Sequence, residues 1–527
     1  MTSDRPGLRP FGRTVVPAPT GAESSAFDAQ AIDKLGVPQP VLMENAGRSA
    51  AQVAARLFPE GRVVGFVGAG NNGGDALVLL RTLAAWGRDV KAVLVADRAS
   101  PEPLSHGWDI PTVSDAELGE DQAAWDALLS PAALLVDGIL GTGVQGAPRA
   151  RQAAAIERLN AAGRPVLAID IPSGVHSGTG QMPGGAVAAD VTVSFGAPKL
   201  GSLLPPGRAQ VGRQVTVEIA FPPMDGPSFT AQVVTPAWAQ ARLPGRGTDT
   251  HKNEVGRVLV VAGRAGMAGA AVLATRGALR AGAGLVQVCS PPSNREILQG
   301  AVPEAIYVDA SDDDALMDAL GQAGAVVIGP GLGTDEDAAA LLARVLAGPP
   351  VPTIVDADGL NLMARDEGSL AKVAAGRPLL ITPHLGEMAR LTGSAGEDIS
   401  SDRVAAAQAG TRSYGCALLL KGAPSLVAGG TAPLLVDTQG SSDLAAAGMG
   451  DVLAGVIGAL LAQGLGPAEA GAVGLYLSGR AANIAALGAS LTPQDVVERL
   501  PDALAERGDG DSDLDLPFVI FDQDAAR

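Results

Sequence analysis

Short apolar runs alternate with alanine-rich stretches through most of this chain, and this alternation constrains its fold more than any other feature. Runs of four to eight apolar residues are typical of buried strands, and the longer stretches between them suit helices. Such alternation predicts crossover units and doubly wound parallel sheets of the α/β class. The expected strands are 63–67, 90–95, 133–136, 165–169, 191–195 and 214–219 in the first half, and 257–262, 285–289, 325–328, 353–355, 379–382, 417–420 and 425–428 in the second.

A proline- and glycine-rich segment over 221–250 separates the two series of strands and predicts a domain boundary. The length of 527 residues is sufficient for more than one domain. We find no short internal repeat, so the halves are expected to be different folds with separate sites. The predicted organisation is a flexible N-terminus over 1–14, a first domain over 15–225, a second domain over 226–504 and a solvated acidic tail over 505–527.

Composition and charge exclude several classes of protein. The chain has 38 Lys and Arg against 56 Asp and Glu, and the resulting charge of −18 repels nucleic acid. The two cysteines, Cys289 and Cys416, lie in apolar runs and are expected to be buried thiols in a reducing compartment. The uncharged stretch 452–468 is broken by glycines and is shorter than the ~20 residues that span a bilayer. We therefore expect a cytoplasmic protein with no nucleic-acid or membrane partner.

Polar loops follow three of the expected strands in the first half. Strand 63–67 leads into GAGNNGGD at 68–75, which lacks both the GxGxxG spacing and the GK[ST] ending of common phosphate loops. The next two loops are DGILGTG at 137–143 and DIPSGV at 170–175. Because ligands of open α/β sheets bind beyond the carboxyl ends of strands, we expect these loops to converge. Taken singly, each aspartate is explained equally well as a turn cap, and 68–75 as a tight turn.

The side chains of these loops suit two kinds of chemistry. Asp137 and Asp170 could share acid and base roles as a carboxylate pair. The oxygens of Asn72, Asp137 and Ser173 could surround a hard cation.

Together with LMENAG at 42–47, the three loops resemble, in order and spacing, the epimerase domain of NAD(P)H-hydrate repair enzymes. The resemblance implies a Rossmann-like three-layer α/β/α domain that interconverts the R and S hydrates at carbon 6 of the reduced nicotinamide. It also implies that Asp170 contacts the nicotinamide end and that Asn72, Asp137 and Ser173 bind potassium. We assign the acid–base work to Asp170, with Asp137 as the second candidate. The implied dinucleotide contacts are Asn71, Asn72, Gly73, Gly74, Asp75, Gly141, Thr142, Gly143, Val144, Gln145, Gly146 and Ala147.

The sharpest feature of the second half is Gly448-Met449-Gly450-Asp451, which runs directly into an apolar helical stretch. Backbone amides at such a helix start form an anion hole, and Asp451 is placed to take a proton from a hydroxyl. This pairing suits phosphoryl transfer. A carboxylate in the first helical turn is also explained as a simple cap.

Three further polar segments, at 356–361, 383–387 and 421–425, also follow expected strands. Lys421 could neutralise a transferring phosphate, His384 could hydrogen-bond a substrate, and the acidic residues could hold magnesium on a nucleotide. A structural His384 and a surface Lys421 are the alternatives.

These motifs resemble the ribokinase-like superfamily and, more narrowly, the ADP-dependent NAD(P)H-hydrate dehydratases. The narrower match adds His251-Lys252 and the segments 256–263, 267–271, 280–286 and 329–333, so it covers about 230–500. Relatives usually carry Thr or Ser at the position of Met449, so a hydroxyl contact is not expected there. The resemblance implies that Asp451 is the base and that magnesium accompanies ADP. The implied hydrate contacts are Ala270, Gly333, His384 and Asp451, and the implied nucleotide contacts are Lys421, Gly422, Ala423, Pro424, Ser425, Gly448, Met449 and Gly450.

The fusion of the two halves is coherent, because an epimerase supplies the stereoisomer that the dehydratase accepts. We predict a bifunctional repair enzyme that restores NADH and NADPH at the expense of ADP, with AMP and phosphate as products. The high alanine and glycine content of the apolar helices and the family resemblance favour a homo-oligomer. The alternatives are a ribokinase-like kinase of small alcohols, such as vitamin precursors, with a regulatory N-terminal domain, and a dinucleotide-binding sensor.

Overall fold

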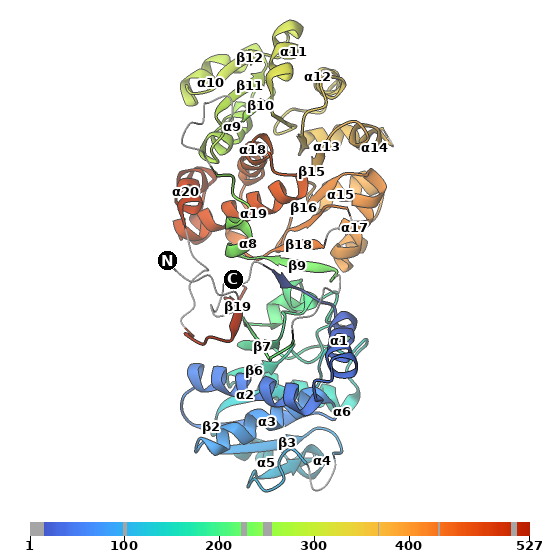
Figure 1. Cartoon of the computed structure of the whole chain (residues 1–527), viewed down its shortest axis with the longest axis vertical. Coiled ribbons are helices and arrows are strands. Elements are labelled where there is room, and N and C mark those ends of the chain that lie inside the picture. Colours follow the sequence, from blue (N-terminus) through green and yellow to red (C-terminus); the bar gives the residue numbers. More distant parts are fainter. Residues whose placement is uncertain are drawn as a thin grey trace. The chain divides into compact units, whose positions relative to one another are not determined.

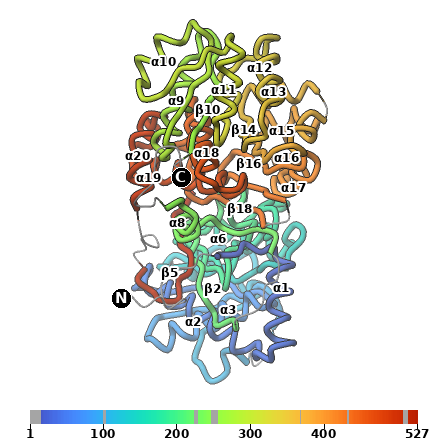
Figure 2. The backbone as a smooth tube through the Cα atoms, turned by 45° about the horizontal axis from the view of Figure 1, so that its top comes forward, coloured from blue at the N-terminus to red at the C-terminus, as the bar shows by residue number. Residues whose placement is uncertain are grey.

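The chain folds into two compact units, shown in Figures 1 and 2. The computed structural model describes residues 15–98, 103–222, 229–245, 256–366, 368–430, 433–506 and 514–526. Unit 1 comprises Met1–Gln232 together with Asp509–Arg527, and unit 2 comprises Val233–Gly508. The chain therefore leaves unit 1, forms all of unit 2, and returns to unit 1 before it ends.

Unit 1 is built on an eight-stranded sheet with the order β19-β8-β7-β6-β5-β2-β3-β4. Neighbouring strands are parallel, except that β19 pairs antiparallel with β8. The strands are β2 (Arg62–Val67), β3 (Val90–Leu94), β4 (Thr112–Ser114), β5 (Ala132–Gly138), β6 (Val166–Ile169), β7 (Val191–Phe195), β8 (Arg213–Val217) and β19 (Val519–Gln523).

Helices cover both faces of this sheet, because its central strands are apolar on both sides. In β2, Val63 and Val67 join one buried cluster, whereas Val64 and Phe66 join the other. The first cluster includes α2 (Gln39–Leu57) and α3 (Asn71–Ala85), and the second includes α5 (Gln122–Leu129) and α6 (Ala150–Ala161). The result is a three-layer α/β/α unit. Its remaining elements are β1 (Val16–Pro17), α1 (Gly21–Ala29), η1 (Gln30–Lys34), α4 (Asp115–Leu118), α7 (Leu200–Leu203) and η2 (Gly207–Gln210).

Unit 2 has its own sheet, in which the order from β18 is β18-β17-β16-β15-β14-β13-β10-β11-β12. Pairing is parallel from β16 to β12, and β16, β17 and β18 form antiparallel pairs. The strands are β10 (Arg257–Val261), β11 (Leu285–Ser290), β12 (Ile306–Asp309), β13 (Ala325–Ile328), β14 (Thr353–Val355), β15 (Leu379–Ile381), β16 (Ala417–Leu420), β17 (Leu426–Ala428) and β18 (Leu434–Asp437).

The core of unit 2 includes residues of α9 (Ala268–Arg280), α18 (Met449–Ala462), α19 (Pro467–Ala485) and α20 (Pro493–Ala505). Glycines let α9 and α18 touch, because a Cβ at Gly455 would lie 1.9 Å from the Ala274 carbonyl oxygen. This contact fixes the start of α18. The other elements are β9 (Ala231–Val234), α8 (Pro236–Gln240), η3 (Pro292–Asn294), α10 (Arg295–Ala301), α11 (Asp313–Gln322), α12 (Glu336–Ala347), α13 (Asp358–Met363), α14 (Ser369–Ala374), α15 (Leu385–Thr392), α16 (Gly396–Ser401), α17 (Arg403–Tyr414), η4 (Ser442–Leu444) and η5 (Gly488–Ser490).

The predicted α/β class is confirmed, and every expected apolar run contains a strand. The prediction of a solvated C-terminal tail is wrong for β19, where Val519, Ile520 and Phe521 are buried. Pairing with β8 buries these three apolar side chains although acidic residues flank them. The predicted flexible segment 1–14 lies outside the described residues.

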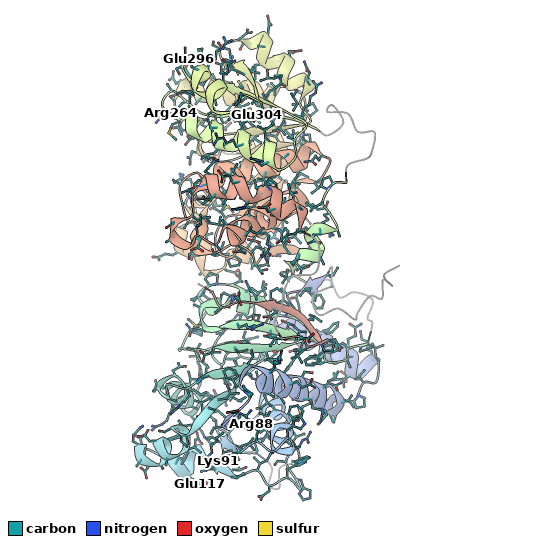
Figure 3. All side chains as sticks on the ribbon, turned by 90° about the vertical axis from the view of Figure 1, so that its left-hand side faces the viewer. Arg88, Lys91, Glu117, Arg264, Glu296 and Glu304 are labelled. Carbon is teal, nitrogen blue, oxygen red and sulfur yellow. The ribbon has the colours of Figure 1, made fainter. Side chains whose placement is uncertain are left out.

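Charged side chains lie on the outside of both units, as Glu117 in unit 1 and Glu296 and Glu304 in unit 2 illustrate (Figure 3). Among the described residues, no helix combines the length and apolar character needed to cross a bilayer.

Candidate active sites

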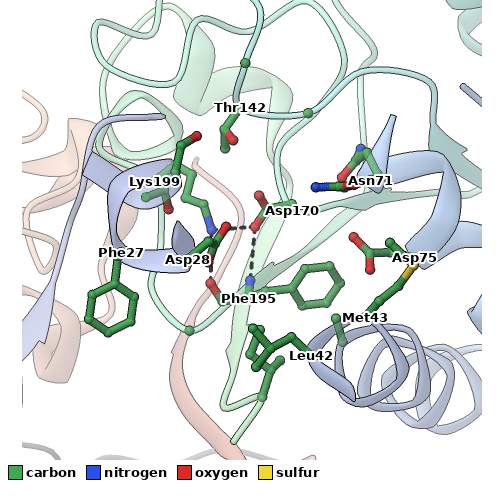
Figure 4. A pocket seen from close by; sticks show the side chains of 18 of the residues that line it. Phe27, Asp28, Leu42, Met43, Asn71, Asp75, Thr142, Asp170, Phe195 and Lys199 are labelled. Carbon is green, nitrogen blue, oxygen red and sulfur yellow. Dashed lines mark hydrogen bonds and ion pairs between the residues drawn. The ribbon is translucent and has the colours of Figure 1, made fainter. Parts of the chain in front are cut away.

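A cavity of about 760 Å³ lies at the C-terminal ends of the unit 1 strands (Figure 4). Three segments predicted to converge contribute to its lining: the start of α3, the loop after β5 and the loop after β6. The predicted residues of these segments that line the cavity are Asn71, Asn72, Asp75, Gly141, Thr142, Gly143, Val144 and Asp170. The predicted residues Gly73, Gly74, Gln145, Gly146 and Ala147 are not among those that line it.

The NNGGD segment is the first turn of α3 and not the loop that we expected. Gly70 is the N-cap, and helical structure begins at Asn71. The glycines are required for close packing, because a Cβ at Gly73 would lie 2.1 Å from the Gly68 carbonyl oxygen and one at Gly74 would lie 2.8 Å from Met43 Cε. The helix start therefore carries polar side chains against the strand ends.

Asp137, Ser173 and Asn72 form one hydrogen-bonded cluster beside this cavity. Ser173 Oγ donates to Asp137 Oδ1 at 2.6 Å, and the Ser173 amide donates to Asp137 Oδ2 at 2.8 Å. Asn72 Nδ2 donates to the carbonyl oxygens of Leu140 and Ile169 at 2.7 and 3.0 Å. Burial raises the pKa of Asp137 to about 6, while its hydrogen bonds with Ser173 oppose the shift.

The Asn72, Asp137 and Ser173 side chains of this cluster carry oxygen atoms that can act as metal ligands. Carboxylate, hydroxyl and amide oxygens suit a hard cation. Asp137 is fully buried and does not line the cavity. Among the described residues, no group of three or more His, Cys, Asp or Glu side chains is arranged to hold a metal ion.

Asp170 is held in an unusual conformation at the cavity wall. Its φ of 65° lies in the left-handed region, which a residue with a side chain seldom adopts. Its carbonyl oxygen accepts a 2.6 Å hydrogen bond from Ser194 Oγ, and Oδ1 accepts one of 3.1 Å from the Phe195 amide. Backbone strain of this kind concentrates at functional sites, where the surrounding contacts enforce it.

Lys199 is the cationic partner of Asp170, and the sequence analysis missed it. Its Nζ donates to Asp170 Oδ1 at 2.5 Å and to the carbonyl oxygens of Phe195 and Ala197 at 3.0 and 3.2 Å. The Lys199 side chain is only 2% exposed and lines the cavity. The signal that could have found it is its place just after β7, a fourth loop at the same edge of the sheet.

Three further carboxyl groups, Asp28, Asp75 and Glu218, line this cavity. Burial is the largest cause that raises the pKa of Asp75 well above its ordinary value, and the charges of Asp170 and Asp28 add to it. Asp28 comes from α1, outside every recognised motif, and was also missed. The cavity therefore combines Asp75, whose burial favours the protonated form, with Asp170, which is paired with an ammonium group.

In unit 2, the predicted anion hole lies at the start of α18. Gly448 is the N-cap with a φ of 90°, so glycine is needed there, and Met449, Gly450 and Asp451 form the first turn. The first amides of a helix have no acceptors within it, and they favour an anion together with the helix dipole.

Lys421 and Asp356 form an ion pair beside this helix start. Lys421 Nζ donates to Asp356 Oδ1 at 2.5 Å, and the Asp356 side chain is 1% exposed. A Cβ at Gly450 would lie 3.3 Å from Lys421 Nζ, so the ammonium group is close to the α18 backbone. Lys421 is thus part of the site and not a free surface residue.

Asp451 lies in the electrostatic field of this pair. Burial raises the pKa of Asp451 to about 7, with a further rise from Asp356 and Asp358 and an opposing effect from Lys421. A carboxylate with a pKa near neutrality can accept a proton and later release it.

The other predicted substrate contacts surround the same strand ends. The Gly333 amide donates to Asp358 Oδ2 at 2.9 Å, and a Cβ at Gly331 would lie 2.8 Å from that of Ala270. The loop 421–425 closes through Ser425 Oγ, which accepts from the Gly422 amide at 3.2 Å and donates to the Gly422 carbonyl oxygen at 2.9 Å. The motif His251-Lys252 lies outside the described residues.

His384 has a structural role in addition to any substrate contact. It is the N-cap of α15, where Nδ1 accepts from the amides of Gly386 and Glu387 at 2.9 and 3.3 Å. On the other side of the ring, Nε2 lies 3.4 Å from Glu387 Oε1, and the His384 side chain is 54% exposed.

Two α/β units, each with acidic and basic side chains gathered at strand ends, define a two-site enzyme. A family model described as YjeF-related protein N-terminus matches residues 39–201, and one described as NAD(P)H-hydrate dehydratase matches 258–502. The bifunctional NAD(P)H-hydrate repair enzyme of Moorella thermoacetica is 38% identical over 497 residues, which cover 89% of this chain and 92% of that protein. The chain belongs to the family of bifunctional NAD(P)H-hydrate repair enzymes, and the resemblance inferred from its motifs is confirmed.

A second bifunctional relative agrees with this assignment. The bifunctional NAD(P)H-hydrate repair enzyme of Escherichia coli is 36% identical over 471 residues, which cover 87% of this chain and 88% of that protein. The solved structure of the ADP/ATP-dependent NAD(P)H-hydrate dehydratase of Bacillus subtilis is 28% identical, covers 51% of this chain and 96% of its own, and gives a TM-score of 0.46.

Proposed function

We propose that this chain repairs hydrated NADH and NADPH in two steps. Unit 1 epimerises the R and S hydrates, and unit 2 dehydrates the S hydrate at the expense of ADP. The observation that carries the proposal is the match to bifunctional repair enzymes along 89% of the chain, which includes both units. The alternative of a small-alcohol kinase is not favoured, because it leaves the charged cavity of unit 1 without a substrate.

In unit 1, Asp170 is the group that exchanges a proton with the substrate. A hydrate at carbon 6 is a hemiaminal, so protonation of its hydroxyl lets water leave, and water can then add to either face of the ring. Lys199 holds the Asp170 carboxylate in place as the proton acceptor, whereas burial raises the pKa of Asp75 and favours its role as the proton donor. The start of α3 and the loop 141–144 hold the dinucleotide in the cavity.

The cluster of Asn72, Asp137 and Ser173 fits a potassium ion, because all three residues carry oxygen ligands and Asp137 is a buried carboxyl with no cationic partner among the described residues. When bound, the ion supplies a fixed positive charge beside the substrate. These residues then orient the loop after β5, because Ser173 Oγ and Asn72 Nδ2 both contact the Leu140 backbone.

In unit 2, Asp451 removes the proton of the carbon-6 hydroxyl as the oxygen attacks the terminal phosphorus of ADP. AMP leaves, and the hydroxyl becomes a phosphate ester, which is a better leaving group. Loss of phosphate and of the carbon-5 proton then restores the dihydronicotinamide. The amides of Gly450 and Asp451, together with Lys421, neutralise charge on the transferred group.

Magnesium bound to the nucleotide would spread the negative charge of the phosphates. The carboxylates of Asp356 and Asp358, just after β14, are oxygen ligands that would fit a hard cation of this kind. The Lys421–Ser425 loop and Gly448–Gly450 hold the nucleotide, and Ala270, Gly333 and His384 hold the hydrate.

The test is the absorbance at 340 nm after the purified chain and magnesium-ADP, or separately magnesium-ATP, are added to a mixture of R and S NADH hydrates. Recovery beyond the S fraction, faster than spontaneous epimerisation, is expected. The absence of recovery with both nucleotides would overturn the repair function and direct attention to small alcohols as kinase substrates.

A further inference from the structure

Arg403 is a buried cation at the nucleotide loop of unit 2, in a position that no motif or comparison assigns. It is the first residue of α17, and its side chain is 6% exposed. Its Nη2 reaches the Lys421 carbonyl oxygen through a long hydrogen bond of 3.4 Å. The guanidinium group therefore lies against the loop that leads from β16 to Ser425.

The guanidinium group of Arg403 packs closely against the backbone of this loop. A Cβ at Gly422 would lie 2.3 Å from Arg403 Nη2 and 2.9 Å from Cζ, so only glycine leaves room for the guanidinium group. The Lys421 ammonium group reaches Asp356, while the Arg403 guanidinium group contacts the Lys421 carbonyl oxygen. The backbone of Lys421 and Gly422 therefore has a cationic group on each side.

Arg403 has no anionic partner among the residues that the structure describes. Its Nε is buried and makes no hydrogen bond there, and the neighbouring Asp402 carboxylate caps α17 by accepting from the Ala405 amide. Burial alone lowers the pKa of Arg403, and no neighbouring carboxylate opposes this effect. A guanidinium group stays protonated in proteins, so no carboxylate among the described residues offsets the cost of burying this charge.

We propose that Arg403 is a phosphate-binding residue of unit 2 and that the anion it lacks is supplied by the phosphates of the adenine nucleotide. This inference rests on the proposed function of unit 2. A guanidinium group forms paired hydrogen bonds with phosphate, and the α18 amides and Lys421 supply further positive charge at the same sheet edge. Arg403 adds a contact that the recognised motifs, 421–425 and 448–451, do not contain.

The experiment is calorimetric titration of the full chain with ADP, AMP and adenosine, the last measured by competition against ADP. R403Q is expected to weaken ADP binding by about tenfold to a hundredfold, because a hydrogen bond to a charged group is lost, and to leave adenosine binding unchanged. R403K, which keeps the charge without the planar guanidinium group, is expected to lie between R403Q and the wild type.

R412Q is the matched control, because Arg412 is exposed on the same helix. This variant is expected to leave the affinities for ADP, AMP and adenosine unchanged. Equal weakening of adenosine and ADP by R403Q would overturn the proposal, since it would show that Arg403 only shapes the loop. If R403Q does not fold, R403K decides the question, and unchanged ADP binding by R403K would overturn the proposal. A wild-type chain that binds ADP but restores no NADH refutes the proposed function alone; one that binds none of the three ligands refutes both.

Discussion

Lys199 Nζ lies 2.5 Å from Asp170 Oδ1, and this ion pair is almost entirely enclosed by unit 1. The other two bonds of the ammonium group go to the carbonyl oxygens of Phe195 and Ala197, so all three of its donors are used. The lysine therefore fixes both the charge of Asp170 and the path of the chain after β7.

Lys199→Met should destabilise unit 1 and stop R/S exchange. Removal of one partner of a buried ion pair leaves the other charge uncompensated, which costs about 3 kcal/mol. Urea unfolding and chromatographic measurement of hydrate exchange would check both effects. The double variant Lys199→Met, Asp170→Asn should recover part of the lost stability without recovering exchange. A double variant no more stable than Lys199→Met would show that the two side chains are not coupled.

Asp451→Asn should abolish nucleotide-dependent formation of NADH while R/S exchange continues, because each activity belongs to a separate unit. Asp170→Asn should do the reverse, and the S hydrate should still be consumed. The two rates can be followed in one sample by absorbance and chromatography. Loss of both activities in a folded Asp451→Asn protein would argue against separate sites.

The rate of dehydration should fall as the pH drops below about 7, because the carboxyl of Asp451 takes up a proton near that pH and can no longer act as a base. Asp356→Asn removes a charge that raises the pKa of Asp451, so the pH below which the rate falls should move to a lower value. Lys421→Met removes a charge that lowers the pKa, so the pH below which the rate falls should move to a higher value.

The quantity to compare is the pH below which kcat/KM falls, because both variants also change the rate itself. Movement of this pH in the same direction in both variants would mean that Asp451 is not the titrating group.

Ser173→Ala should remove the dependence of R/S exchange on potassium. The hydroxyl contacts Asp137 Oδ1 and the Leu140 backbone, so its loss takes away one oxygen ligand and loosens the loop after β5. Exchange would be compared in potassium and in tetramethylammonium salts, with Ser177→Ala, in the same segment, as the control. Retention of full potassium activation by Ser173→Ala would exclude this cluster as the ion site.

Deletion of residues 514–527 should unfold unit 1 and leave dehydration by unit 2 intact. The deletion removes the buried side chains of Leu514, Val519, Ile520 and Phe521, each of which contributes about 2 kcal/mol. It also breaks the Arg213–Asp522 ion pair, in which Nη2 and Oδ2 are 2.5 Å apart. Hydrate exchange and separate thermal transitions would report the result, and normal exchange in the shortened chain would refute it.

The strands were predictable because buried parallel strands are apolar on both faces, and their turns carry glycine and polar residues. The same rule placed Asp170 at a strand end, whereas Asp451 was predicted from the glycine-rich start of a helix. The sequence pattern could not show which charged side chains come into contact in the fold. Lys199 is 29 positions from Asp170 and belongs to no motif, so only the fold brings its ammonium group to that carboxylate.

Two other features could not be predicted from the sequence, for physical reasons. The strand β19 follows an acidic segment and is short, so local composition indicated a tail although pairing with β8 buries it. Arg403 begins a helix with little segregation of apolar residues, and its burial depends on Gly422, which is a neighbour only in space.

The return of the chain to unit 1 also sets an order of assembly during synthesis. The ribosome makes β2 to β8 first, then the whole of unit 2, and only at the end the strand that covers the free edge of β8. Until then β8 presents unpaired backbone groups, which are a template for association with other chains. The epimerase unit begins folding first and is completed last, so its yield in the cell depends on how quickly unit 2 is made.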